Sequence, residues 1–522
     1  MRRFWLALFV SLGLFSSESL RESPFTGPKV LAVSGMEQIR LGEWQLPQTL
    51  TVLQAAKNEY EGFQLLIRAP KGGLSNVRVE LEPFRNEAGE TLPPPTLYRE
   101  HYVYAHAVKQ DYYKRETFVA TNVPGGAGWY ADALIPFEVE KADARFRAQP
   151  FEVAGFQNQP IWIDVYVPEE AQAGRYTSQY TVSSDQGEVT GEVRLEVWNF
   201  TLPKSPSLGS SFLVWDYNEK AMYVELLKHK LMPDYVEREY QAELLEDWGL
   251  RLLRLGFVSG GDYKSCAMRP PPSLAEMEKA ASEQDERLSL YIYPADEITG
   301  CLNLTPDLRA WADVAQEAGV KNLIPMFPRP DLYEGEARSA VDVWVIYAEQ
   351  LMAEGALATV QAVQAKGDEV WSYTALAGEP YQPQWALNYG AFDFRLLAGF
   401  VNLRYDMTGL LYWRVDNWSE DPWRALKVTG DPNNYPAGEG MLLYPGEAVG
   451  VNGVVPSIRL KWLREGVEDY EYGQLLKTLG KREVLEPAVQ RVVADWYHWT
   501  RDVRVLERSR QELAEAIVAG QQ

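Results

Sequence analysis

The sequence predicts a multidomain β plus α/β protein: an N-terminal antiparallel β-sandwich, then a (β/α)8 TIM-like barrel with a helical C-terminal extension. The chain has 522 residues, which is too long for a single hydrophobic core. Short alternating strands fill its first part, and apolar runs alternate with helical stretches in its second part. We expect the sandwich at residues 27–203, the barrel at 208–455, and helices packed on the barrel at 456–522.

The sandwich prediction depends on alternating strands with turns at short spacing. In "PIWIDVYVPEEAQAGRYTSQYTVSS" one strand ends at a Pro-bounded turn and a second begins after Gly174, and "GEVRLEVWNFTL" gives a further strand. This pattern is typical of an antiparallel sandwich. The Pro- and Ser-rich stretch Thr201–Ser211 marks the boundary with the barrel.

Eight apolar runs follow this boundary, and most of the gaps between them have helical periodicity. The runs are Ser211–Trp215, Arg251–Phe257, Leu288–Tyr293, Asn322–Phe327, Asp342–Ile346, Glu369–Ala375, Gly409–Val415 and Met441–Pro445. Strand–helix alternation predicts a parallel sheet, and eight units in about 250 residues is the size of a (β/α)8 barrel. In the tail, one apolar stripe at helical spacing predicts a helix that packs on the barrel; it comprises Leu460, Leu463, Val467 and Tyr470.

The first residues have the pattern of an export signal. Arg2 and Arg3 precede an apolar stretch from Phe4 to Phe15, and small residues follow. This stretch is too short to span a membrane comfortably. We expect residues 1–17 to be a signal peptide and the protein to be secreted or periplasmic, without an integral membrane span. A short buried N-terminal helix is the alternative.

Charge and composition exclude several classes of function. The net charge of −22 argues against a nucleic-acid partner, because phosphates would be repelled. The four histidines are scattered and no CxxC motif occurs, so we expect no metal site. No organic cofactor is implied either. Cys266 and Cys301 form either one disulfide or two buried free thiols, and the sequence does not separate these. They follow the second and third predicted strands, so a bridge between them would brace two neighbouring loops.

The stretch "LSLYIYPADEITG" contains the candidate catalytic residues. A buried-strand pattern breaks at Pro294 and leads directly to two carboxylates, Asp296 and Glu297. In a barrel, the C-terminal ends of the strands carry the chemistry. Adjacent strand residues point to opposite faces, so both carboxylates can serve one pocket only if the backbone turns between them or just before them. The alternative is that the two residues cap the next helix.

Several separate stretches resemble glycoside hydrolase family 123, whose known members are β-N-acetylgalactosaminidases, and relatives that share its C-terminal region. "NEYEGFQLLI", "GWYADALIPFEV" and "WIDVYVPEEAQAGRYTSQYTV" resemble the N-terminal sandwich of that family. "YIYPADEI" resembles its catalytic strand end, and "GLLYWRVDNW" and "PSIRLKWLREGVEDYEYGQLL" resemble its late barrel strand and closing helix. The resemblance covers most of the chain after the export signal.

The resemblance implies a retaining hydrolase of β-linked N-acetylhexosaminides that works by substrate assistance. The 2-acetamido group of the sugar attacks the anomeric carbon and forms an oxazoline-like intermediate. Glu297 would be the general acid and later activate water, and Asp296 would hold the acetamido N–H. Two close carboxylates cannot both ionise freely, which raises one pKa, as an acid working near neutral pH requires. The family commonly continues Asp-Glu with Pro, whereas Ile298 and Thr299 follow here, which leaves the sugar specificity open.

Four further residues are candidates for substrate binding. Trp215, Tyr373 and Trp413 lie at or near predicted strand ends, where an aromatic ring can stack on a pyranose; each of them can instead belong to the core. Asn417 follows the seventh strand and could bond a sugar hydroxyl or make an Asx-turn.

Two other functions stay open at this point. Glu379 follows the sixth strand and could be the covalent nucleophile of an ordinary retaining glycosidase, if its carboxyl group lay about 5–5.5 Å from that of Glu297. A barrel that binds glycans without catalysis is the other. In each case the partner is an oligosaccharide or glycoconjugate.

We expect the charged residues of the closing helix to be structural; they are Arg459, Arg464, Glu468 and Asp469.

Overall fold

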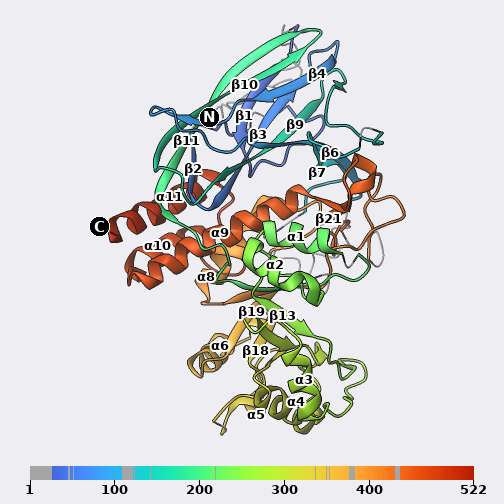
Figure 1. Ribbon diagram of the computed structural model, residues 1–522, viewed down its shortest axis with the longest axis vertical. Coiled ribbons are helices and arrows are strands. Elements are labelled where there is room, and N and C mark those ends of the chain that lie inside the picture. Colours follow the sequence, from blue (N-terminus) through green and yellow to red (C-terminus); the bar gives the residue numbers. More distant parts are fainter. Residues whose placement is uncertain are drawn as a thin grey trace, which may run out of the picture.

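The computed structural model describes residues 26–521 with internal gaps at 45–46, 51, 108–121, 123, 142, 218, 336, 348–349, 352, 376–381 and 430–435. The predicted signal peptide, residues 1–17, and the candidate nucleophile Glu379 both lie outside the described residues. Figure 1 shows a sheet-rich upper part, a barrel below it, and the C-terminal helices between and beside the two.

The upper part consists of two sheets that pack face to face, which confirms the predicted sandwich. One sheet has the order β1 (Lys29–Ser34), β3 (Glu59–Arg68), β9 (Asn158–Val167), β6 (Thr96–Ala105), β7 (Gly128–Pro136). The other has the order β2 (Leu53–Lys57), β11 (Gly187–Thr201), β10 (Gly174–Ser184), β4 (Leu74–Leu81), β8 (Phe151–Val153), and β5 (Arg85–Asn86) pairs with β10. All the pairs are antiparallel except β2–β11. Along β10, buried side chains alternate with exposed ones, as a half-buried strand requires.

The lower part is a parallel barrel, which confirms the predicted TIM-like architecture. Its strands follow the order β12 (Gly209–Phe212), β20 (Gly409–Tyr412), β19 (Glu369–Tyr373), β18 (Val343–Tyr347), β17 (Lys321–Pro325), β15 (Ser289–Ile292), β13 (Leu252–Leu255). Each of these seven strands corresponds to one of the predicted apolar runs.

The eighth place in the barrel is taken by a segment that the sequence did not single out. Phe212 N donates to Met232 O (2.9 Å), Asp234 N donates to Phe212 O (3.1 Å), and Arg254 N donates to Asp234 O (2.9 Å). Residues 232–234 therefore close the gap between β12 and β13 with a single parallel bridge. A three-residue segment with Pro233 at its centre has no strand-length apolar pattern, so sequence periodicity could not reveal it.

The predicted eighth strand, Met441–Pro445, is not part of the barrel. Its residues form β21 (Leu443–Pro445), which pairs antiparallel with β22 (Val454–Pro456) in a separate two-stranded sheet. The run is apolar because it is buried against the sandwich side of the molecule, where Tyr444 lies in a core with Tyr130 and Ile135.

Helices surround the barrel and complete the chain. Those of the barrel are α1 (Lys220–Lys228), α2 (Arg238–Trp248), α3 (Leu274–Ser282), α4 (Thr305–Glu317), α5 (Pro330–Tyr333), α6 (Ala356–Ala365), α7 (Ala391–Leu396) and α8 (Asn402–Arg404), with the π-helical turn η4 (Leu397–Val401) between α7 and α8. The tail forms α9 (Ile458–Thr478), α10 (Arg482–Val492) and α11 (Val503–Gly520). Within the described residues, no helix combines the length and the apolar character needed to cross a bilayer.

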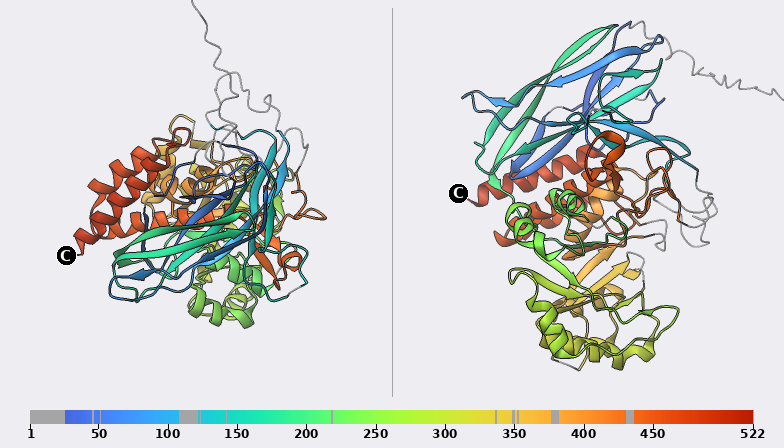
Figure 2. Two further views of the ribbon diagram at one scale, coloured as in Figure 1. Left: turned by 90° about the horizontal axis from the view of Figure 1, so that it is seen from above. Right: turned by 45° about the vertical axis from the view of Figure 1, so that its right-hand side comes forward.

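Helix α9 lies between the sandwich and the barrel and is buried on nearly all sides (Figures 1 and 2). Ser457 caps its start by accepting a hydrogen bond from Leu460 N at 3.2 Å. Its predicted apolar stripe faces the core, but its charged residues are buried as well. On the barrel side, Gly466 lets α7 approach closely, because a Cβ there would lie 2.3 Å from the carbonyl oxygen of Arg395.

The charges of α9 form ion pairs with the sandwich and the barrel. Lys461 Nζ lies 2.6 Å from Asp164 Oδ2, and Arg464 Nη2 lies 2.8 Å from Asp164 Oδ1. Arg459 pairs with Asp132 of β7 at 2.7 Å, and Asp469 pairs with Arg395 of α7 at 2.7 Å. Burial alone would raise the pKa of Asp164, but the two cations outweigh burial and lower it.

We expect Asp164→Asn to destabilise the fold by about 3–5 kcal/mol, because it removes the nearest carboxylate of two buried cations, Lys461 and Arg464. Since the folded pKa is lowered, the stabilisation from Asp164 is present at neutral pH and is lost as the pH falls below about 4, the value in an unfolded chain. Thermal or urea unfolding measures both effects.

The matched control is Glu192→Gln, which removes a carboxylate paired at the surface with Arg194. This change should cost less than about 1 kcal/mol. Equal losses for the two variants would contradict the role assigned to Asp164.

Candidate active site

Asp296 and Glu297 lie at the C-terminal end of β15, on the loop that leaves the barrel. After Ile292 the chain forms a second short strand, β16 (Ala295–Asp296), which pairs in parallel with β14 (Gly261–Asp262) from the loop after β13. Ala295 and Ile298, which flank the two carboxylates, are buried in the core. The backbone of the pair is therefore fixed from both sides.

The backbone turn that the pair requires occurs at Glu297 itself. Glu297 has φ of +52°, in the left-handed region that residues other than glycine seldom adopt. This conformation costs on the order of 1–2 kcal/mol and breaks the alternation that would send the two side chains to opposite faces. The charge of Glu297 contributes to the raised pKa of Asp296, and, after burial, both carboxylates contribute to the raised pKa of Tyr373. Backbone strain of this kind persists only where the surrounding structure enforces it, and strained residues cluster at active sites.

Each carboxylate accepts a hydrogen bond from a tyrosine. Tyr293 Oη donates to Asp296 Oδ1 at 2.7 Å, and Tyr347 Oη donates to Glu297 Oε1 at 2.5 Å. Burial, followed by the neighbouring Tyr373 and Glu297, raises the pKa of Tyr347, so its hydroxyl stays protonated and can donate. The ring of Tyr347 packs against that of Tyr373 with centroids 4.6 Å apart. The side chain of Glu297 thus has a defined position.

The pKa of Asp296 is raised from its ordinary value. Part of its side chain reaches solvent, but the surrounding protein still desolvates the carboxylate, and this is the largest cause. The hydrogen bond from Tyr293 opposes the shift, and the charges of Glu297 and Asp262 add to it.

The three aromatic candidates occupy two positions in the barrel. Trp215 and Trp413 follow the neighbouring strands β12 and β20, and their rings meet edge to face with centroids 6.1 Å apart. Trp215 is 59% exposed, which leaves most of its ring available. Trp413 Nε1 donates to Glu439 Oε1 at 2.5 Å. Tyr373, at the end of β19, is largely buried and lies beside Tyr347 and the two carboxylates.

Asn417 has a structural environment. Its side chain is buried, and its amide nitrogen donates to Thr429 Oγ1 at 2.9 Å and to Glu439 O at 3.3 Å. These bonds hold the loop after β20 and leave the amide N–H groups no free direction toward a sugar hydroxyl. Sequence position alone could not distinguish this from a ligand contact.

The preceding residue, Asp416, shapes the site and was not singled out in the sequence. Its Oδ2 accepts hydrogen bonds from the backbone nitrogens of Trp215 (3.1 Å), Asp216 (2.7 Å) and Tyr217 (3.0 Å). Its Oδ1 accepts from Arg414 Nε at 2.9 Å. One buried carboxylate thereby fixes the turn that presents Trp215. Tyr347 was also missed, although it directly follows the predicted strand Asp342–Ile346, which was a usable signal.

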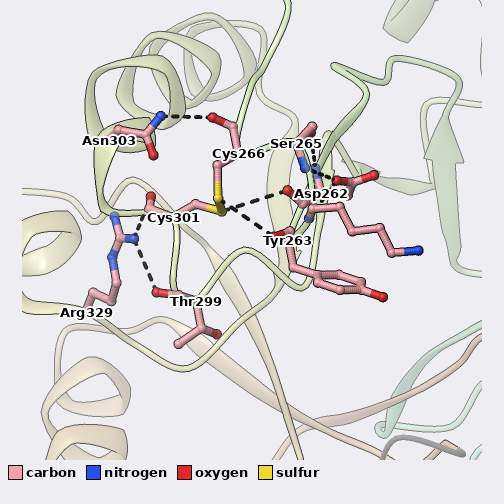
Figure 3. The surroundings of a disulfide bond; sticks show 9 residues. Asp262, Tyr263, Ser265, Cys266, Thr299, Cys301, Asn303 and Arg329 are labelled. Carbon is pink, nitrogen blue, oxygen red and sulfur yellow. Dashed lines mark hydrogen bonds between the residues drawn. A yellow bond between two sulfur atoms is a disulfide. The ribbon is translucent and has the colours of Figure 1, made fainter.

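Cys266 and Cys301 form a disulfide that joins the loops after β13 and β15 (Figure 3). This decides between the two states that the sequence left open. Around it, Asn303 Nδ2 donates to Cys266 O at 2.9 Å, and Arg329 Nη1 donates to Cys301 O at 3.0 Å. The loop that carries Asp296 and Glu297 is thus held covalently to its neighbour. Among the described residues, no cluster of three or more His, Cys, Asp or Glu side chains could hold a metal ion.

Glycoside hydrolases commonly use a pair of carboxyl groups, and a carboxylate pair on a strand-end loop of a TIM-like barrel is compatible with that chemistry. The family model of the glycoside hydrolase 123 catalytic domain matches residues 332–476, and that of the glycoside hydrolase 123 N-terminal domain matches residues 42–184. Together they cover more than half of the chain. The protein belongs to glycoside hydrolase family 123. The catalytic match begins after Asp296 and Glu297, so the role of these two residues depends on their geometry.

A solved structure shares the fold over nearly the whole chain. It is a family 123 glycoside hydrolase from Clostridium perfringens, described in terms of glycolipid glycan hydrolysis, with 13% sequence identity and a TM-score of 0.63 over 94% of this chain and 98% of that chain. A β-glucuronidase from Parabacteroides merdae matches at 12% identity over 80% of this chain and 51% of that chain, with a TM-score of 0.27, which is too low to support a conclusion. No curated protein sequence matches the chain significantly.

We expect the unreduced, denatured protein to show no reactive thiols, and two after reduction, because the chain has only the two cysteines of this disulfide. Titration with a thiol reagent measures this. Reduction of the native protein should also lower the melting temperature, since the bridge closes a loop across a sequence separation of 35 residues. Two reactive thiols before reduction would contradict the bridge.

We expect Tyr347→Phe to lower kcat by about 10- to 100-fold, because it removes a hydrogen bond worth about 1–3 kcal/mol that holds the Glu297 carboxyl group in place. Steady-state kinetics on a substrate cleaved by the wild type measures this. Tyr470→Phe is the matched control, since it removes a buried tyrosine hydrogen bond to Met407 O, away from the pair. A normal kcat in Tyr347→Phe would show that the contact does not matter for turnover.

Proposed function

We propose that the protein hydrolyses β-linked N-acetylhexosaminides of the GalNAc type with retention, by substrate-assisted catalysis. The observation that carries the proposal is the Asp296–Glu297 pair at the end of β15: the chain turns at Glu297, and each carboxylate accepts a hydrogen bond from a tyrosine. Membership of family 123 supports hydrolysis of a glycosidic bond. The Clostridium perfringens relative, described in terms of glycolipid glycan hydrolysis, supports a glycoconjugate substrate.

In the first step, the acetamido oxygen of the substrate attacks the anomeric carbon and the bond to the leaving oxygen breaks. Glu297 gives its proton to that oxygen, while Asp296 accepts a hydrogen bond from the acetamido N–H, which becomes more acidic as positive charge develops. In the second step, Glu297 takes a proton from water, water attacks the anomeric carbon, and the oxazoline-like ring opens. Two inversions give net retention, and no enzyme nucleophile is required.

Tyr293 and Tyr347 position the two carboxylates for these steps. Tyr293 binds one oxygen of Asp296, so the other oxygen can meet the acetamido group. Tyr347 binds Oε1 of Glu297, which assigns proton transfer to Oε2. The exposed ring of Trp215, beside Trp413, is our candidate platform for a pyranose ring.

We also propose that the protein acts outside the cytoplasm, in the periplasm or as a secreted enzyme. The disulfide supports this, because such bonds form and persist in oxidising compartments. The basic and apolar pattern of residues 1–17 supports it further.

The proposal is tested with aryl β-glycosides that carry or lack the 2-acetamido group. We expect turnover only of the 2-acetamido substrates, and inhibition by a thiazoline mimic of the intermediate. Glu297→Gln should lower kcat by about 10²–10⁴-fold on a poor leaving group while substrate affinity is kept. Equal turnover of both substrate sets, or no effect of the thiazoline, would rule out substrate assistance. Glycan binding that persists in a wild type without turnover would favour a binding protein.

A further inference from the structure

A third carboxylate, Asp262, lies beside the proposed catalytic pair and comes from a different loop. Strand β14 pairs in parallel with β16, and Asp262 is the residue in register with Asp296. Neighbouring strands lie about 4.8 Å apart, and residues in register point to the same face. The sheet therefore brings the Asp262 side chain next to that of Asp296.

The position of Asp262 is fixed by its own loop. Its Oδ1 accepts hydrogen bonds from the backbone nitrogens of Ser265 (2.7 Å) and Lys264 (2.9 Å), and its carbonyl oxygen accepts from Cys266 N at 3.0 Å. Cys266 is bonded to Cys301 in the loop after the pair, and Figure 3 shows the carboxylate of Asp262 on the side of its turn away from the disulfide. The hydrogen bonds from Ser265 and then Lys264 lower the pKa of Asp262, so it is ionised at working pH.

We propose that Asp262 is a positioning residue of the hydrolase site: its fixed negative charge acts on Asp296 and strengthens the negative potential in which the positive charge of the oxazoline-like intermediate develops. This inference rests on the function proposed above. A preorganised charge costs no reorganisation during the reaction. The same charge makes Asp296 harder to ionise, and Asp262 is among the causes of its raised pKa.

Several other groups also affect the pKa of Asp296, and their effects must be distinguished from the effect of Asp262. Glu297 adds a second like charge, and Tyr293 donates a hydrogen bond. Tyr373, from β19, is a buried neutral hydroxyl whose pKa is raised by burial and then by Asp296. All three are unchanged when only Asp262 is altered.

Asp262 also caps the turn at residues 263–266, so a purely structural role is the competing explanation. Asp262→Asn separates the two roles. Asparagine keeps a side-chain oxygen that can accept from Lys264 and Ser265, but it removes the charge. Should this variant fail to fold, Asp262→Ser retains a weaker cap and removes the same charge.

We expect the acid limb of the kcat/KM–pH profile to move to lower pH by about 0.5 unit in Asp262→Asn, because loss of a neighbouring negative charge lowers the pKa of Asp296. We also expect the plateau value of kcat to fall by about 3- to 10-fold, because the intermediate loses part of its electrostatic stabilisation. The melting temperature should stay close to that of the wild type.

The matched control is Asp285→Asn. Asp285 is half-buried like Asp262 and also holds a turn, since its Oδ1 accepts from Arg287 N at 3.0 Å, but it precedes β15 and lies at the opposite end of the barrel. Asp285→Asn changes the net charge by the same amount as Asp262→Asn and should leave the kcat/KM–pH profile unchanged. A profile of Asp262→Asn that matches the wild type, or a shift of equal size in Asp285→Asn, would overturn the inference.

A measurement that does not require turnover distinguishes a failure of this inference from a failure of the proposed function. The titration of Asp296 is followed by carboxyl ¹³C NMR and assigned with Asp296→Asn. A lower Asp296 pKa in Asp262→Asn supports the coupling even if the wild type cleaves no acetamido glycoside, in which case only the proposed function fails. An unchanged Asp296 pKa overturns the coupling whether or not the protein is active.

Discussion

Asp164 of strand β9 joins the two halves of this protein. It is buried and accepts hydrogen bonds from Lys461 and Arg464 of α9, as well as from the indole nitrogen of Trp162 at 2.7 Å. A buried carboxylate with two cations is favourable only when its geometry is complete, because desolvation of each ion is costly. Helix α9 must therefore dock in one register, and the barrel, which packs against the other side of α9, is placed with it.

This docking has a consequence for the active site. Two residues that precede β7, Asn122 and Gly125, connect the sandwich to the loop after β19: Gly125 N donates to Asn388 O at 2.7 Å, and Asn122 Nδ2 donates to Gln382 O at 2.9 Å. That loop leaves the barrel at the end where Tyr373 and the carboxylate pair lie. The sandwich thus supports the catalytic side of the barrel.

At the site itself, the conformational strain arises at one residue, Glu297, and contacts in two loops compensate for it. Glu297 adopts a left-handed conformation that its side chain disfavours. The burial of Ala295 and Ile298, the β14–β16 pairing and the disulfide hold that conformation in place. Local strain that the surrounding structure enforces is a common way to preorganise functional groups. The tyrosine donors then fix the side-chain directions.

Sequence by itself determined the layered architecture, seven of the barrel strands and the placement of Asp296 and Glu297 at a strand end, because apolar periodicity is set by local burial. It could not reveal the short segment 232–234 that closes the barrel, since a single bridge leaves no period to detect. Only the tertiary structure decided the pairing of Cys266 with Cys301, the turn at Glu297 and the approach of Asp262, because each depends on contacts between loops that are distant along the chain. It also decided that Asn417 holds a loop, since its partners come from residues beyond the strand.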